Sequence, residues 1–306
     1  MKRIGINHTY WGTDFAADPG EYCRRIGRAA ALGFDLLTVG QEVPLMFSKS
    51  DQQMLLDTAE RENVKLNFSG GFGPNQDICS DSAEQRNAGI AHLQNVARRL
   101  SELQDGAEFA GAITGVFRDS LGQRDIERCW ENCVNSMREA IQVAEDHGVI
   151  FSIEVLNRFE HFLINTSEQA VRFVEQVGSP NLKILLDTYH MNIEEDSFHD
   201  AIVRVGDKLG LFHICENNRR PPGRGHIPWD EVVGALKQID YQGDTVMEPV
   251  VLPGGIVGRA LAIWRDLTDG EDLDEAARKG LQFYRSKLAS VQEKSMDTEM
   301  SNRSSV

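Results

Sequence analysis

The sequence predicts an α/β fold of the (β/α)8 (TIM) barrel class in a single domain. Short apolar runs alternate with longer helical patterns from one end of the chain almost to the other, and there are eight such runs. No linker or shift in composition divides the 306 residues, a length that one α/β barrel commonly reaches. Strands that alternate with helices pair in parallel through right-handed crossovers, and eight such units close on themselves.

The eight expected strands are short and mostly apolar, and helical spacing follows each of them. In chain order they are residues 3–7, 34–40, 64–70, 109–114, 149–155, 182–188, 209–215 and 243–250. Residues 125–148 are typical of the segments between them, with apolar residues three and four apart and a closing glycine. Residues 291–306 are polar and rich in serine, so we expect a disordered tail after a catalytic barrel domain of residues 1–290.

An open, doubly wound sheet is the main alternative to a barrel. Such a sheet is expected to carry a glycine-rich phosphate-binding turn after an early strand. The motif SGGFGP at residues 69–74 does not match G-x-G-x-x-G and does not begin a helix. The barrel is therefore the preferred fold.

The formal net charge of −15 limits the partners of this chain. An acidic surface repels phosphate backbones, which argues against nucleic acids and anionic membranes. No apolar run approaches the roughly 20 residues of a membrane span, and the first residues lack the apolar core of a signal peptide. The five scattered cysteines suit free thiols, with Cys129 and Cys133 on one helix face, and we expect a cytoplasmic protein.

Four consecutive expected strands carry an ionisable residue near their carboxyl ends. Glu154, Asp187, His213 and Glu248 each follow three to six apolar or small residues, at separations of 33, 26 and 35 residues. Any one of them could be a polar strand end satisfied by backbone or solvent. Four at equivalent positions would meet at the barrel mouth, where they would repel one another without a cation. Three carboxylates and one imidazole predict a divalent metal site, with Mn²⁺ expected and Co²⁺ or Mg²⁺ as alternatives.

Such a metal site suits proton abstraction next to a carbonyl group. An ion that chelates a carbonyl and the neighbouring hydroxyl acidifies the C–H between them and stabilises the resulting enediolate. Glu154 and Glu248 come from non-adjacent strands and could stand on opposite faces of that carbon. One would remove a proton and the other would return one to the far side, which gives an epimer.

Four motifs around these residues resemble the ketose 3-epimerase family, the group of D-tagatose and D-psicose (allulose) 3-epimerases within the xylose-isomerase-like barrels. They are IEVLNRFE, LLDTYHMNIEE, FHICENNRRPPGRGHIPWDE and VMEPVV. The resemblance spans nearly all of residues 1–290. It implies a free, non-phosphorylated ketose as substrate and a homodimer or homotetramer. It also implies that the four residues above are metal ligands and that the two glutamates are the acid/base pair.

The resemblance further implies that Glu160 supports the catalytic groups and that His190 and Arg219 hydrogen-bond the sugar. Taken alone, Glu160 could be an ordinary acid at a helix start, His190 a packed loop histidine and Arg219 part of a turn-rich loop. Glu194 and Glu195 lack such support, and we interpret them as a negatively charged helix start.

Departures from the family pattern leave the preferred ketose open. Asn7 stands where family members commonly have an aromatic residue, and Ser69 and Gly70 stand where the tagatose enzyme has cysteines. In the family these positions flank the distal part of the sugar. Four aromatic residues could line the C–H face of the sugar or simply pack: Tyr10, Trp11, Phe15 and Phe72.

Other activities of the same barrel group remain alternatives. An aldose–ketose isomerase of the hydroxypyruvate isomerase type would use the same ligands, and a lyase acting on 3-keto-glycosides would use the same acidified C–H. A DNA-repair endonuclease would need further zinc ligands and a basic groove, against which the net charge argues. A sugar-binding module would not need a costly cluster of carboxylates.

Overall fold

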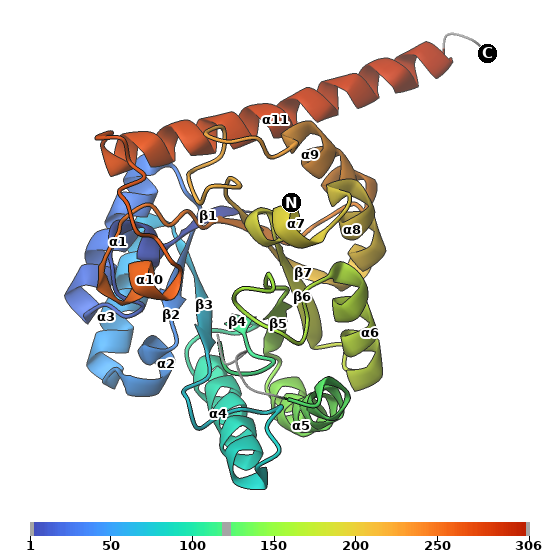
Figure 1. Cartoon of the computed structure of the whole chain (residues 1–306). Coiled ribbons are helices and arrows are strands. Elements are labelled where there is room, and N and C mark those ends of the chain that lie inside the picture. Colours follow the sequence, from blue (N-terminus) through green and yellow to red (C-terminus); the bar gives the residue numbers. More distant parts are fainter. Residues whose placement is uncertain (1–2, 118–123, 304–306) are drawn as a thin grey trace.

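Eight parallel strands form a closed barrel in chain order, from β1 to β8, in the computed structural model, which describes residues 3–117 and 124–303 (Figure 1). The strands are β1 Ile4–Asn7, β2 Leu36–Gly40, β3 Lys65–Gly71, β4 Glu108–Ala112, β5 Ile150–Glu154, β6 Leu182–Asp187, β7 Leu209–Ile214 and β8 Asp244–Met247. Pairing of Ile6 in β1 with Met247 in β8 closes the barrel. The predicted fold class and all eight predicted strands are confirmed, with ends that differ by a few residues.

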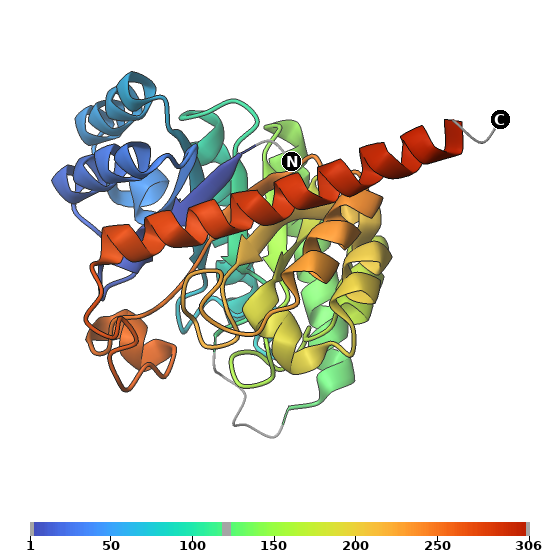
Figure 2. The same cartoon turned by 90° about the horizontal axis from the view of Figure 1, so that it is seen from above.

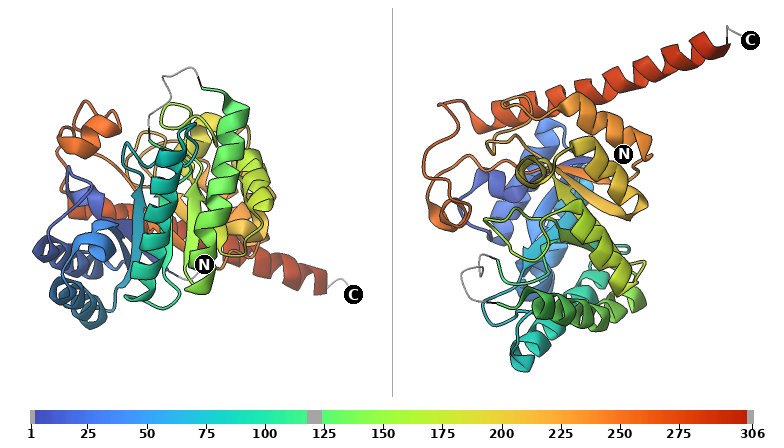
Figure 3. Two further views of the ribbon diagram at one scale, coloured as in Figure 1. Left: turned by 90° about the horizontal axis from the view of Figure 1, so that it is seen from below. Right: turned by 45° about the vertical axis from the view of Figure 1, so that its right-hand side comes forward.

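Helices cover the outside of the barrel (Figure 3). They are α1 Pro19–Leu32, α2 Glu42–Met46, α3 Lys49–Glu62, α4 Ala83–Ser101, α5 Ile126–Asp146, α6 Ser167–Val177, α7 Thr188–Glu194, α8 Phe198–Val205, α9 Trp229–Gln238, α10 Gly255–Ala260 and α11 Leu273–Arg303, with 3-10 turns η1 His8–Trp11 and η2 Gly206–Lys208. Local signals set several ends. Asp18 caps α1 ahead of Pro19, Thr166 and Gln169 form a capping box on α6, and Gly178 ends α6 in the left-handed conformation.

The last helix crosses one side of the barrel and projects past it (Figure 2). It continues to Arg303, so the backbone of residues 291–303 is helical where the sequence predicts a disordered tail. The boundary of the catalytic domain at residue 290 stays a prediction. No helix among residues 3–117 and 124–303 combines the length and the apolar character that crossing a bilayer requires.

An apolar layer fills the barrel beneath its mouth. It consists of Leu36, Ala110, Leu185, Leu211 and Val246, all fully buried. Two residues further along three of these strands come Asp187, His213 and Glu248. Because side chains alternate along a strand, these three groups point into the same interior, one layer above the apolar side chains. The fold thus delivers the ionisable groups to the carboxyl end of the barrel.

Tyr10 and Trp11 pack rather than line an open wall. The Tyr10 hydroxyl donates to the carbonyl of Leu273 at 2.8 Å, and Trp11 Nε1 donates to Asp274 Oδ1 at 2.9 Å, so both rings tie η1 to the start of α11. Of the other two aromatic candidates, Phe72 meets the His92 ring edge-on and Phe15 is exposed. All five cysteines are free, and Cys129 and Cys133 lie in one helix, α5, as predicted; both are buried.

Gly111 permits the close approach of β3 and β4. Its φ is +137°, and a Cβ there would lie 2.3 Å from the carbonyl oxygen of Gly70. We expect Gly111→Ala to lower the free energy of unfolding by about 2–4 kcal/mol, since the backbone conformation of residue 111 and the spacing between β3 and β4 must both change. In the α9 interior, where a Cβ on Gly234 meets nothing within 4 Å, Gly234→Ala should be neutral or stabilising by about 0.5–1 kcal/mol. Urea unfolding followed by circular dichroism measures both, and equal effects would contradict this account.

Candidate metal centre

The four ionisable residues predicted to converge do lie together at the barrel mouth. Glu154, Asp187, His213 and Glu248 each offer one ligand atom, and these atoms all lie within 4.8 Å of one another. Asp187 and His213 are paired across β6 and β7. His213 Nδ1 lies 3.2 Å from Glu248 Oε2 and 3.8 Å from Glu154 Oε1.

Local structure turns one oxygen of Asp187 toward this centre. Asp187 ends β6 and caps α7, so its Oδ1 accepts from the backbone N–H of Tyr189 at 2.8 Å. Its buried Oδ2 and both ring nitrogens of His213 have no hydrogen-bond partner within the described part of the chain. Buried polar atoms without partners cost roughly 1–3 kcal/mol each. A cation held in the cluster would bind Asp187 Oδ2 and one of the two ring nitrogens of His213.

The charges of the cluster also call for a cation. Burial and the neighbouring Glu248 raise the pKa of Glu154. Burial works in the same direction on Glu248, but His213 and Arg219 outweigh it and lower the pKa of that carboxyl. Burial lowers the pKa of His213, yet the carboxylates of Glu248 and Glu154 raise it to about 9. A divalent cation can take the place of the protons that these groups otherwise retain, and three carboxylates with one imidazole are donors that suit it.

Arg219 lies beside the cluster, where two carboxylates and an aromatic ring surround its guanidinium. Its Nη1 is 3.5 Å from Asp187 Oδ2, its Nη2 donates to Glu160 Oε1 at 3.2 Å, and its guanidinium carbon is 3.8 Å from the centre of the Tyr189 ring. Both Arg219 and Glu160 are buried. Glu160 is therefore a buried partner of Arg219 in the loop after β5, not an ordinary acid at a helix start.

His190 presents a hydrogen-bond donor to the same centre. Its Nδ1 accepts from the backbone N–H of Asn157 at 3.2 Å, so that nitrogen carries no proton. Burial and Arg219 lower the pKa of His190 to about 3, which keeps the ring neutral near pH 7. The proton is therefore on Nε2, which lies 3.7 Å from Glu154 Oε1. Asn157 was not identified from the sequence, because nothing in its motif distinguishes a partner of His190 from a turn residue.

The loop that carries Arg219 is held by a buried carboxylate, that of Glu216. Its Oε1 accepts from the backbone N–H of Gly223 at 2.5 Å and from Trp229 Nε1 at 2.8 Å, and its Oε2 accepts from the N–H of Ile227 at 3.1 Å. Arg219 itself has a left-handed backbone with φ +64°. Such a conformation costs about 1–3 kcal/mol and persists only where the surroundings enforce it. Sequence reasoning missed Glu216, whose partners are mostly backbone groups.

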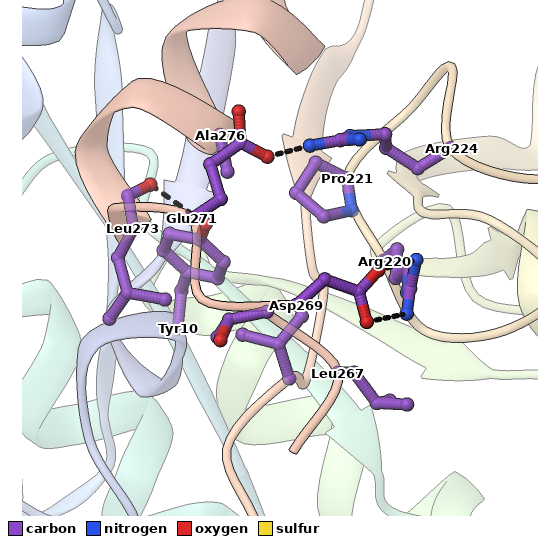
Figure 4. A pocket seen from close by; sticks show the side chains of 11 residues that line it. Tyr10, Arg220, Pro221, Arg224, Leu267, Asp269, Glu271, Leu273 and Ala276 are labelled. Carbon is purple, nitrogen blue, oxygen red and sulfur yellow. Dashed lines mark hydrogen bonds and ion pairs between the residues drawn. The ribbon is translucent and has the colours of Figure 1, made fainter.

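Two ion pairs join the outer side of this loop to the segment before α11 (Figure 4). Arg220 Nη1 lies 2.7 Å from Asp269 Oδ2, and Arg224 pairs with Glu271. These residues line a small pocket together with Tyr10 and Pro221. Because the arginines there are paired with carboxylates, we assign the pocket to loop anchoring.

The interpretation of Glu194 and Glu195 as a helix start is wrong. Glu194 is the last residue of α7 and Glu195 follows it, because α7 begins at Thr188 directly after β6. Glu194 accepts from Arg158 Nη2 at 2.7 Å. Glu195 accepts from the N–H of Ser167 at 2.5 Å, so its charge does sit at a helix start, but at that of α6.

The two glutamates of the cluster are its accessible members. The Glu154 and Glu248 side chains are 11% and 19% exposed, whereas those of Asp187 and His213 are 0% and 3% exposed. Asp187 and His213 therefore form the floor of the centre. The two glutamates are the members of the cluster that solvent reaches.

Comparison with known proteins gives the family of this chain. The family model described as xylose isomerase-like TIM barrel matches residues 26–287. A D-psicose 3-epimerase of Ruminiclostridium cellulolyticum is 40% identical over 92% of this chain and 96% of its own length, and an L-ribulose 3-epimerase of Methylomonas sp. is 30% identical over 93% and 98%. The solved D-psicose 3-epimerase of Clostridium cellulolyticum H10 with D-tagatose superposes with a TM-score of 0.88, at 39% identity over 94% of this chain and 99% of that one. The chain belongs to the xylose isomerase-like TIM barrel family and, within it, to the ketose 3-epimerase group, so it is an enzyme of the epimerase class.

Proposed function

We propose that the protein inverts the configuration at C3 of a free, non-phosphorylated ketose, with Glu154 and Glu248 as the acid/base pair. The observation that carries the proposal is that these two carboxylates are the accessible members of the cluster and come from β5 and from the residue after β8. A carbon held over the floor of the centre would have one of them on each side. Relatives named for D-psicose and L-ribulose support a free ketose as the substrate.

The four side chains would hold a divalent cation, which when bound would polarise the carbonyl and hydroxyl oxygens of the sugar and so acidify the C3–H bond. One glutamate takes the C3 proton, and the other delivers a proton to the opposite face. One C–H bond breaks and one forms, so no oxidant or second substrate is needed. The two glutamates exchange roles when the reaction runs in reverse.

Arg219 and His190 would orient the carbonyl end of the sugar. The described residues offer no hydrogen-bond partner to Arg219 Nη1, and the Nε2–H of His190 points toward Glu154. Arg219 Nη1 makes longer contacts, of 3.5 Å to Asp187 Oδ2 and 3.9 Å to Glu248 Oε2. Because these contacts are long, both donors could also hydrogen-bond sugar oxygens. Glu160 and the Tyr189 ring keep the guanidinium in place while the substrate binds.

Mn²⁺ is the ion that we propose, because three hard oxygen donors and one nitrogen suit it, with Co²⁺ or Mg²⁺ as alternatives. We also propose that the protein forms a homodimer or homotetramer and that it is cytoplasmic. The first rests on the likeness to the ketose 3-epimerase group, and the second on the composition of the chain.

Deuterium labelling tests the reaction directly. Protein loaded with Mn²⁺ and incubated in D₂O with D-fructose or D-tagatose should yield the C3 epimer with deuterium at C3, detected by NMR. The label enters at C3 because the returned proton comes from a carboxyl that exchanges with solvent. Label at C1 together with an aldose product would instead indicate an isomerase. Loss of a leaving group from a 3-keto-glycoside would indicate a lyase.

Removing either carboxylate should abolish turnover without unfolding the protein. We expect Glu154→Gln and Glu248→Gln each to lower kcat by about 10³-fold or more, since each amide can neither accept nor deliver the proton. Circular dichroism should show an unchanged fold. Glu175→Gln on α6, where the exposed carboxylate pairs with Lys208 at 3.2 Å, is the matched control and should keep full activity. Retention of more than a tenth of kcat by Glu154→Gln or Glu248→Gln would contradict the assigned roles.

Metal removal should affect both activity and stability. A chelator should abolish turnover, and Mn²⁺ should restore it. Because the four ligands converge only in the folded chain, Mn²⁺ at 1,000 times its Kd should stabilise the protein by about 4 kcal/mol and raise its Tm. Asp187→Asn should lose most of this Tm increase, because the substitution removes the negative charge of one of the four candidate ligands. A Tm that does not respond to Mn²⁺ in the unmodified protein would argue against a metal site.

A further inference from the structure

Asn7 lies beside Glu248 across the seam at which the barrel closes. Pairing of Ile6 with Met247 makes the next residues of the two strands, Asn7 and Glu248, neighbours. Asn7 Nδ2 donates to Glu248 Oε1 at 2.7 Å, and the Asn7 side chain is buried. This short hydrogen bond from a neutral donor to a carboxylate is of the strong, charge-assisted kind.

Two contacts with Thr9 determine which end of the Asn7 amide faces the glutamate. Asn7 Oδ1 accepts from the backbone N–H of Thr9 at 3.1 Å and from Thr9 Oγ1 at 3.0 Å, as the cap of η1. A backbone N–H can only donate, so the amide oxygen must face Thr9. The two hydrogen bonds from Thr9 therefore direct the NH₂ group of Asn7 at Glu248.

The hydrogen bond from Asn7 fixes the orientation of the Glu248 carboxylate. The last torsion of a glutamate side chain is broad, so an unrestrained carboxylate would rotate. With Oε1 held by Asn7, Oε2 is the oxygen that lies 3.2 Å from His213 Nδ1 and 3.9 Å from Arg219 Nη1. Asn7 thus does for Glu248 what the N–H of Tyr189 does for Asp187.

We infer that Asn7 is a positioning residue for Glu248: its amide holds one carboxylate oxygen so that the other is presented to the metal centre and to one face of the substrate. The inference deepens the proposed epimerase function and rests on it. It also predicts an asymmetry. Loss of the Asn7 amide should impair proton transfer on the Glu248 face and leave proton transfer by Glu154 largely intact.

Hydrogen exchange with two epimers measures this asymmetry. Asn7→Leu keeps the approximate volume of the side chain and removes the donor; Asn7→Ala serves if the leucine variant does not fold. At saturating Mn²⁺ in D₂O, inversion of D-fructose and of D-psicose should fall together, about tenfold, because the equilibrium constant ties the two directions. Deuterium uptake into recovered substrate should fall about tenfold for the epimer whose C3–H faces Glu248. It should persist for the other epimer, because Glu154 can remove that proton and return a deuteron to the same face.

A second measurement does not depend on activity. Titration calorimetry of the metal-free protein should give a Kd for Mn²⁺ about tenfold weaker in the Asn7 variants than in the unmodified chain, as is usual when the partner of a metal ligand is removed. Thr38→Val is the matched control. Thr38 pairs with Asn7 across β1 and β2, is fully buried, and has an Oγ1 without a hydrogen-bond partner among residues 3–117 and 124–303. It should leave the Mn²⁺ affinity and the exchange pattern unchanged.

The outcomes separate the two proposals. If the unmodified protein exchanges and inverts C3 but the Asn7 variants slow exchange equally for both epimers and bind Mn²⁺ within twofold of it, the positioning role is overturned and the epimerase function stands. If the unmodified protein neither inverts nor exchanges C3 of any ketose, the proposed function is overturned. The Mn²⁺ titration then still reports whether Asn7 orients Glu248 toward the metal.

Discussion

Three carboxylates and an imidazole forced to within 4.8 Å of one another are the constraint around which this barrel mouth is built. The alternation of side chains along the strands places these groups directly above an apolar layer, so little water can screen them. At the floor, Asp187 Oδ2 and the ring nitrogens of His213 have no hydrogen-bond partner among the residues that the structure describes. A divalent cation would relieve the repulsion and would bind one atom of each residue, so its binding would be coupled to the stability of the fold.

The remaining groups of the site hold the ligands in place from outside. Asp187 is oriented by the start of α7 and Glu248 by Asn7 at the end of β1. Arg219 is fixed by Glu160, by the Tyr189 ring and by a loop that Glu216 ties together. These supports come from four different strand-to-helix connections. The orientation of the ligands therefore depends on closure of the whole barrel, not on any one loop.

Local sequence patterns predicted the fold and the four candidate ligands. The residues that orient these ligands, in contrast, depend on contacts between distant segments, which local patterns do not encode. An apolar run that ends in a charged residue identifies Asp187 and His213, because one strand suffices to place each side chain. Asn7 follows an equally plain run, but its role appears only when β1 closes on β8. Glu216 binds backbone groups, which carry no sequence signal. Glu195 does not begin a helix, contrary to what the sequence suggested, but lies against the start of α6, twenty-eight residues earlier in the chain.

The charges of the site balance in a way that suits epimerisation in both directions. Four carboxylates of the site are buried or nearly buried: Glu154, Glu160, Asp187 and Glu248. The last three lie within 4 Å of the Arg219 guanidinium, while His190 is neutral. A divalent ion bound with a neutral His213 brings the positive charge to three against four. One proton on the glutamate pair then makes the site neutral, which a region poor in water favours. A pair that shares one proton always contains one acid and one base. In the proposed reaction either glutamate would hold that proton, so the same electrostatic balance would serve both epimers of the substrate.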